Sequence, residues 1–95
     1  MYLIAYHFDG DPAELAAAHD RMVALFPPDA LDLHVSVVVE GGLVVFDSCP
    51  SRADFIAFSE SPEFRNGLVA AGLPEPRLEP LGEVHSAYLR DGVRS

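Results

Sequence analysis

Four side chains that can take part in chemistry lie within an apolar stretch of the chain, residues 32–50, DLHVSVVVEGGLVVFDSCP. They are His34, Ser36, Asp47 and Cys49. A carboxylate beside an imidazole can orient the ring and stabilise its protonated form, which suits proton transfer near neutral pH. A serine hydroxyl or an ionised thiol can act as a nucleophile. The stretch therefore places candidate acid–base or nucleophilic groups on segments that otherwise have the composition of buried strands.

The spacing of these side chains indicates a β-hairpin that turns at residues 41–42. Two adjacent glycines can supply the positive φ angles that a two-residue primed turn requires. With both glycines in the turn, Ser36 faces Asp47 and His34 faces Cys49 on the neighbouring strand. Asp47 is then diagonal to His34 on the same face, where its carboxylate can hold the imidazole.

The two faces of this hairpin differ in composition. His34, Ser36 and Asp47 share one face, and the other face carries a mainly apolar series: Leu33, Val35, Val37, Val39, Val44, Phe46 and Ser48. We assign the apolar series to the side of the sheet that helices cover, and the polar set to the opposite side. A register slipped by one residue would move Asp47 against the helices, where an unpaired carboxylate is costly.

Strands and helices around the hairpin can be placed from local signals. Residues 1–8 are rich in aromatic and branched side chains and indicate a strand. A helix follows, because Asp11 can cap it, Pro12 suits its first position and Glu14 completes a capping box. It ends before the prolines at residues 27–28.

A second helical region is predicted from Ser51, with a break at Ser61-Pro62 and an end at Gly72. The proline-rich residues 74–80 indicate an extended connection, and residues 81–89 indicate the last strand. Residues 90–95 are expected to be a frayed tail.

The resulting order of strand, helix, strand, strand, helix, strand is that of a ferredoxin-like α+β domain. We therefore predict a single domain over residues 1–95, with both helical regions on one face of a four-stranded antiparallel sheet. Residues 2–6 are apolar on both sides of the first strand, so the second sheet face also needs a cover. A second copy of the chain is the simplest cover, and we expect a homodimer.

Composition excludes several classes of function. The chain has 95 residues and a formal net charge of −9, and its six basic residues are arginines scattered along the sequence. Such a surface repels nucleic acid and anionic membranes. One cysteine allows no internal disulfide, and the four histidines lack the close spacing of metal ligands, so no metal site is expected. The first apolar run is too short for a signal peptide or a membrane span, which leads us to expect a cytoplasmic protein.

Several segments together resemble the dimeric α/β-barrel superfamily: GGLVVFDSCPSRADFIAFSESPEF, LVAAGLPEP, EVHSAYL and, before the first helix, DGDPAEL. This superfamily contains antibiotic-biosynthesis-type monooxygenases, stress-responsive barrel proteins and muconolactone isomerases. The chain is most similar to small bacterial members that carry a histidine before a valine, as in His34-Val35, and a final Val-His, as in Val84-His85. The resemblance implies a homodimeric barrel without a cofactor, which binds its ligand between sheet and helices or inside the barrel.

The resemblance and the residues together suggest a cofactor-independent monooxygenase, isomerase or cyclase that acts on a hydrophobic cyclic or aromatic molecule. His34 would be the acid or base and Asp47 would orient it. Ser36, His85 and Tyr6 would contact oxygen atoms of the substrate. Oxygenation, isomerisation and cyclisation all begin with proton removal next to a carbonyl or phenol.

Other hypotheses remain open at this stage. The chain could be a non-catalytic dimer that binds a metabolite or a protein, with its histidines at the subunit interface. Haem binding is a third hypothesis; haem-degrading members of the superfamily use a histidine on a helix, but the sole histidine on a predicted helix here, His19, lies in a different helix. A hydrolytic triad with Ser36 is disfavoured, because a flat strand offers neither an exposed elbow nor an oxyanion hole. Cys49 is expected to be a small buried residue, and His7 and His19 are expected at the surface or in a supporting role.

Overall fold

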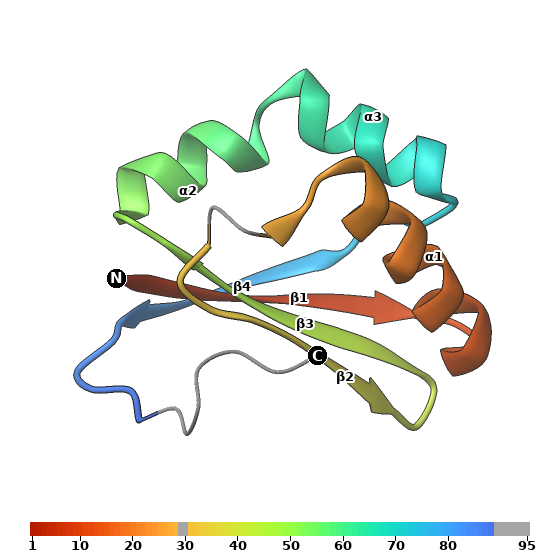
Figure 1. The fold of residues 1–95 in the computed structure, drawn as a ribbon, viewed down its shortest axis with the longest axis horizontal. Coiled ribbons are helices and arrows are strands. Elements are labelled where there is room, and N and C mark those ends of the chain that lie inside the picture. The colour runs from red at the N-terminus through yellow and green to blue at the C-terminus, as the bar shows by residue number, and fades with distance from the viewer. Residues whose placement is uncertain (29–30, 89–95) are drawn as a thin grey trace.

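A computed structural model describes residues 1–28 and 31–88, and within them the chain forms one antiparallel sheet with helices on one face (Figure 1). In chain order the elements are β1 (Tyr2–Asp9), α1 (Pro12–Leu25), β2 (His34–Val39), β3 (Gly42–Cys49), α2 (Arg52–Ser59), α3 (Pro62–Ala71) and β4 (Arg77–Glu83). The four strands lie in the order β2-β3-β1-β4. The predicted ferredoxin-like α+β fold is confirmed. The tail predicted for residues 90–95 lies outside the described residues.

Local signals in the sequence set the limits of the helices. The Asp11 side chain accepts a hydrogen bond from the Glu14 N–H at 3.0 Å, which caps α1. Ser61 caps α3 through the N–H of Phe64 at 3.3 Å, so the predicted break between α2 and α3 is confirmed. Gly72 ends α3 in the left-handed conformation with φ of 83°.

The core fills the space between the helices and one face of the sheet, which we call the helix face. On β1 this face carries the buried side chains of Tyr2, Ile4, Tyr6 and Phe8. Leu43 and Val45 extend it onto β3, and the helices contribute Leu15, Ala18, Phe55, Phe64 and Leu68. Side chains alternate along a strand, so residues between these positions lie on the opposite, open face.

The register of the hairpin differs from the prediction by two residues. Val39 pairs with Gly42, so the turn is formed by Glu40 and Gly41, and Gly42 belongs to β3. A Cβ atom on Gly42 would lie 2.3 Å from the carbonyl oxygen of Phe8, so the close approach of β1 requires a glycine at this position. In the observed register His34 lies directly opposite Asp47, and Cys49 lies beyond the strand pairs of β2.

The prediction that the polar set points away from the helices is wrong. A shift of two residues keeps His34, Ser36 and Asp47 on one face, but this is the helix face, since Asp47 pairs with Ile4 and shares its side of the sheet. The expected cost of a carboxylate near the helices does not arise, because His34 lies opposite Asp47 and bonds to it.

The apolar series of the hairpin lies on the open face instead. Val35, Val37 and Val39 keep 40%, 39% and 38% of their surface exposed there. The open face of the described chain therefore carries an apolar stripe on its β2 side.

The last strand begins and ends earlier than predicted. β4 covers Arg77–Glu83, which includes most of the segment that we predicted as a connection. Pro80 is tolerated because β4 is an edge strand and needs to pair on one side alone. His85 consequently follows the strand and is exposed.

Among the described helices, none combines the length and the apolar character that a membrane crossing requires.

Candidate acid–base site

A pocket of about 210 Å³ opens between α1, α3 and the helix face of the sheet, and we call it the His34 pocket. Its walls are mostly apolar, and they include Phe8, Met22, Val23, Phe26, Leu31, Val45, Phe58, Phe64, Leu68 and Leu73. Four of its lining residues carry polar groups: Tyr6, His19, His34 and Asp47. A largely apolar cavity with a few converging polar groups is the usual form of a small-molecule site.

His34 and Asp47 form the polar centre of this pocket. They face each other across β2 and β3, and His34 Nδ1–H donates a hydrogen bond to Asp47 Oδ1. Each side chain is 18% exposed, so the pair is largely withdrawn from water. A proton fixed on Nδ1 leaves the lone pair of the neutral ring on Nε2, which is the nitrogen available for proton transfer.

His19 reaches the same centre from α1. Its Nε2 lies 2.9 Å from Nε2 of His34. The two ring planes are within 10° of each other, and the ring centroids are 5.1 Å apart. Since the two nitrogens are much closer than the ring centres, the rings meet edge to edge, as an in-plane N–H···N hydrogen bond requires.

The position of His19 follows from the periodicity of α1. His19 is four residues after Leu15 and three before Met22, so all three lie on one stripe of the helix. Leu15 is buried and Met22 packs against the core. We expected His19 at the surface or in a supporting role, and this spacing was the signal that could have placed it in the pocket.

The chain of polar groups continues from His19 to the protein surface. His19 Nδ1 lies 3.4 Å from Asp20 Oδ1, and the Asp20 side chain is 84% exposed. His19 is therefore placed between a buried carboxylate–imidazole pair and water.

Tyr6 brings a phenol to the pocket from β1. Burial is the main cause that raises the pKa of Tyr6; the negative charge of Asp47 adds to it, as does that of Cys49 at a pH where its thiol ionises. The phenol therefore keeps its proton across the physiological range and can donate a hydrogen bond to a ligand oxygen. The sheet face of Tyr6 could not be assigned from the sequence, and the structure places it on the helix face.

Cys49 lies at the end of β3 and packs against the core as a free cysteine. Burial raises the pKa of its thiol, and the carboxylates of Asp47 and Asp54 raise it further. A thiol that holds its proton is a weak nucleophile, so this environment favours the expected structural role.

Ser36 and His85 do not line the His34 pocket. Ser36 is exposed and faces Val45, nearer to the hairpin turn than His34 is. His85 follows the end of β4. The structure thus brings Tyr6, His34 and Asp47 together from the predicted set, adds His19, and places Ser36 and His85 elsewhere.

In the described part of the chain, no group of three or more histidine, cysteine, aspartate or glutamate side chains is arranged to hold a metal ion. The two Nε2 atoms of the pocket point at each other instead of at a common third position.

Comparison with known proteins supports the fold. No family model matches the chain, and no curated protein matches it. A solved structure from Deinococcus radiodurans, provisionally named an antibiotic biosynthesis monooxygenase, is similar with a TM-score of 0.61. The similarity covers 97% of this chain and 100% of that chain, at 12% sequence identity. At this identity the likeness shows a shared fold.

Proposed function

We propose that the chain is a cofactor-independent enzyme of the antibiotic-biosynthesis-monooxygenase-like superfamily that acts on a hydrophobic cyclic or aromatic small molecule in the His34 pocket. The observation that carries this proposal is the His34–Asp47 pair, which lies at the centre of an otherwise apolar pocket. A volume of about 210 Å³ suits a molecule of one or two rings.

In this proposal His34 Nε2 removes a proton from a carbon or oxygen next to a carbonyl or phenol. Asp47 holds the ring in the required tautomer and balances the positive charge that the ring gains. The Tyr6 phenol, which keeps its proton, donates a hydrogen bond to the oxygen where negative charge develops. Apolar walls exclude water and strengthen both interactions.

Deuterium exchange tests this proposal without knowledge of the natural substrate. The probe is 2-tetralone, a two-ring ketone whose acidic C–H groups lie next to the carbonyl. In D₂O the wild-type protein should speed the loss of these protons, as followed by ¹H NMR. His34→Gln should reduce the protein-dependent rate by about a hundredfold or more, because general base catalysis is worth at least that much.

The matched control is His7→Gln, which removes a histidine from the open face and leaves the pocket intact. Its exchange rate should equal that of the wild type. Equal rates for wild type and His34→Gln would contradict the proposal.

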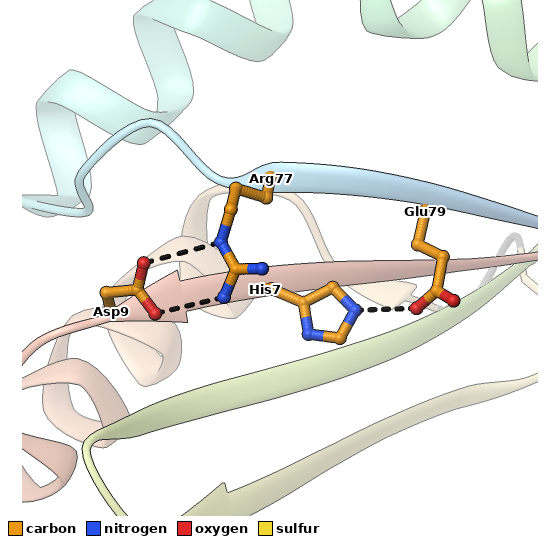
Figure 2. A network of polar contacts seen from close by, with 4 residues as sticks. All are labelled: His7, Asp9, Arg77 and Glu79. Carbon is orange, nitrogen blue, oxygen red and sulfur yellow. Dashed lines mark hydrogen bonds and ion pairs between the residues drawn. The ribbon is translucent and has the colours of Figure 1, made fainter.

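We also propose that a second copy of the chain covers the open face. Support comes from the exposed stripe of Val35, Val37 and Val39 on that face. On the same sheet β1 and β4 carry ion pairs (Figure 2), His7 with Glu79 at 2.8 Å and Asp9 with Arg77 at 3.1 Å, and β3 separates them from the valines of β2. A face that combines an apolar stripe with charged pairs has the make-up of a protein interface.

A further inference from the structure

Every ring nitrogen of the two pocket histidines has a polar partner. Nδ1 of His34 bonds to Asp47, the two Nε2 atoms are 2.9 Å apart, and Nδ1 of His19 faces Asp20. Since Asp47 accepts the Nδ1–H of His34, the neutral His34 ring has its lone pair on Nε2. His19 Nε2–H therefore donates to His34, and it occupies the lone pair that the proposed reaction needs.

We propose that His19 is a positioning residue. In the free protein its Nε2–H bonds to His34 Nε2, and the acidic group of the substrate takes that same position when it binds. A substrate that presents a polarised O–H or C–H to His34 must displace the His19 N–H from the same nitrogen. This inference rests on the proposed function and narrows its substrate class: an apolar ring system with one such acidic group at its edge. Molecules of the same shape that lack the group leave the two histidines paired.

The contacts of His19 permit this exchange. A hydrogen bond between neutral groups contributes little net free energy, so a substrate hydrogen bond of similar strength can replace it. In this neutral tautomer His19 Nδ1 carries a lone pair, so its 3.4 Å contact with the exposed Asp20 carboxylate is not a hydrogen bond. The strong hydrogen bond of the His19 side chain is therefore the one to His34.

The proton balance of the step is simple. The X–H bond of the substrate breaks, its electron pair stays on X, and a new N–H bond forms at His34 Nε2. His34 becomes an imidazolium whose Nδ1–H remains bonded to the Asp47 carboxylate. The displaced His19 takes no part in this bond exchange, which is why we describe it as a positioning residue.

An NMR measurement on the wild-type protein tests the displacement directly. With ¹⁵N-labelled histidine, an N–H···N bond gives a coupling between the two Nε2 nuclei across the hydrogen bond. The probes are 2-naphthol, which has an acidic O–H, and 2-methoxynaphthalene, which has nearly the same shape without it. We expect the coupling in the protein alone, its loss on saturation with 2-naphthol, and its persistence with 2-methoxynaphthalene.

A variant gives an independent readout of affinity. If His19 competes with the ligand for His34, then His19→Leu should raise the affinity for 2-naphthol relative to 2-methoxynaphthalene by about three- to tenfold, as measured by calorimetry. If His19 instead stabilised the bound ligand by contact, His19→Leu would lower the affinity for 2-naphthol relative to 2-methoxynaphthalene. His7→Gln is the control and should leave both affinities unchanged.

The possible results separate the two proposals. Bound 2-naphthol with the coupling intact, or a lower relative affinity in His19→Leu, would overturn the role of His19 and leave the His34 proposal standing. Binding of neither compound to the wild type would overturn both.

Discussion

At the scale of single residues, the function that we propose depends on the hydrogen bond between the largely buried Asp47 carboxylate and His34. Asp47 is tolerated under the helices because β2 places His34 opposite it. His34 in turn meets His19 from α1. A pairing that relieves the cost of burying a charge also produces an oriented base in an apolar pocket.

Tyr6 provides a residue-scale prediction about alkaline stability. Burial and the nearby Asp47 raise its pKa above the value of about 10 expected in the unfolded chain. The contribution of Tyr6 to the free energy of unfolding is fully present below about pH 10. It is lost as pH rises towards the folded pKa, because the unfolded chain releases a proton that the folded state keeps. Urea titrations should show the free energy of unfolding falling above about pH 10.

The Tyr6→Phe variant should make this fall in the free energy of unfolding less steep by up to about 1.4 kcal/mol per pH unit. That is the slope produced when the unfolded chain binds one proton fewer than the folded state. Tyr88→Phe is the control, because Tyr88 is 93% exposed, and it should leave the slope unchanged. Equal slopes in wild type and Tyr6→Phe would show that Tyr6 ionises in the folded state as it does in the unfolded chain.

At the scale of elements, two adjacent glycines distinguish the observed hairpin register from the one that we predicted. Gly41→Ala meets open space but must adopt φ of 75°, which costs about 1 kcal/mol. Gly42→Ala places a Cβ atom 2.3 Å from the backbone oxygen of Phe8, so β1 and β3 must separate. We expect this second variant to lose at least about 2 kcal/mol more in urea titrations, a cost typical of overpacking. Equal losses would favour a turn formed by both glycines.

The same elements show what could be predicted from the sequence and what could not. Helix limits were predictable because capping side chains such as Asp11 and Ser61 act within one turn of the chain. The hairpin register was not, because the carbonyl oxygen of Phe8, more than thirty residues away in the chain, decides that Gly42 lies in the strand. β4 was misplaced because its prolines suggested a loop, and its position at the sheet edge depends on the topology.

The central pair of the candidate site, His34 and Asp47, was predictable from the sequence, but its location was not. The sequence indicated that His34 and Asp47 share a face, which holds in either register because the two differ by an even number of residues. Which face they share depends on what covers it. His19 on α1 is the polar partner there, and its spacing from Leu15 and Met22 was the overlooked signal.

At the scale of the whole molecule, helices cover one face of the sheet (Figure 1). The other face carries the exposed stripe of Val35, Val37 and Val39. The function assigned to the helix face and the dimer proposed for the open face are therefore separate claims. A change on the open face should alter assembly without altering the chemistry of the His34 pocket.

Val37→Glu tests this separation. A charge in the middle of the stripe should weaken association by about tenfold or more, because an unpaired charge in an interface costs at least about 1.4 kcal/mol. Sedimentation equilibrium over a range of concentrations would measure the shift, with Val69→Glu, on the exposed side of α3, as control. A wild-type protein that stays monomeric at all concentrations would refute the dimer. The 2-tetralone exchange rate of Val37→Glu should equal that of the wild type.

The central claim is that a small molecule meets His34 between the helices and the sheet, and the position of bound 2-naphthol tests it most directly. Intermolecular nuclear Overhauser effects can be recorded on protein labelled at histidine, methionine and valine. We expect contacts from the ligand to the imidazole of His34 and the methyl group of Met22, which line the pocket. Contacts confined to Val35 and Val37 would place the ligand on the open face and contradict the account.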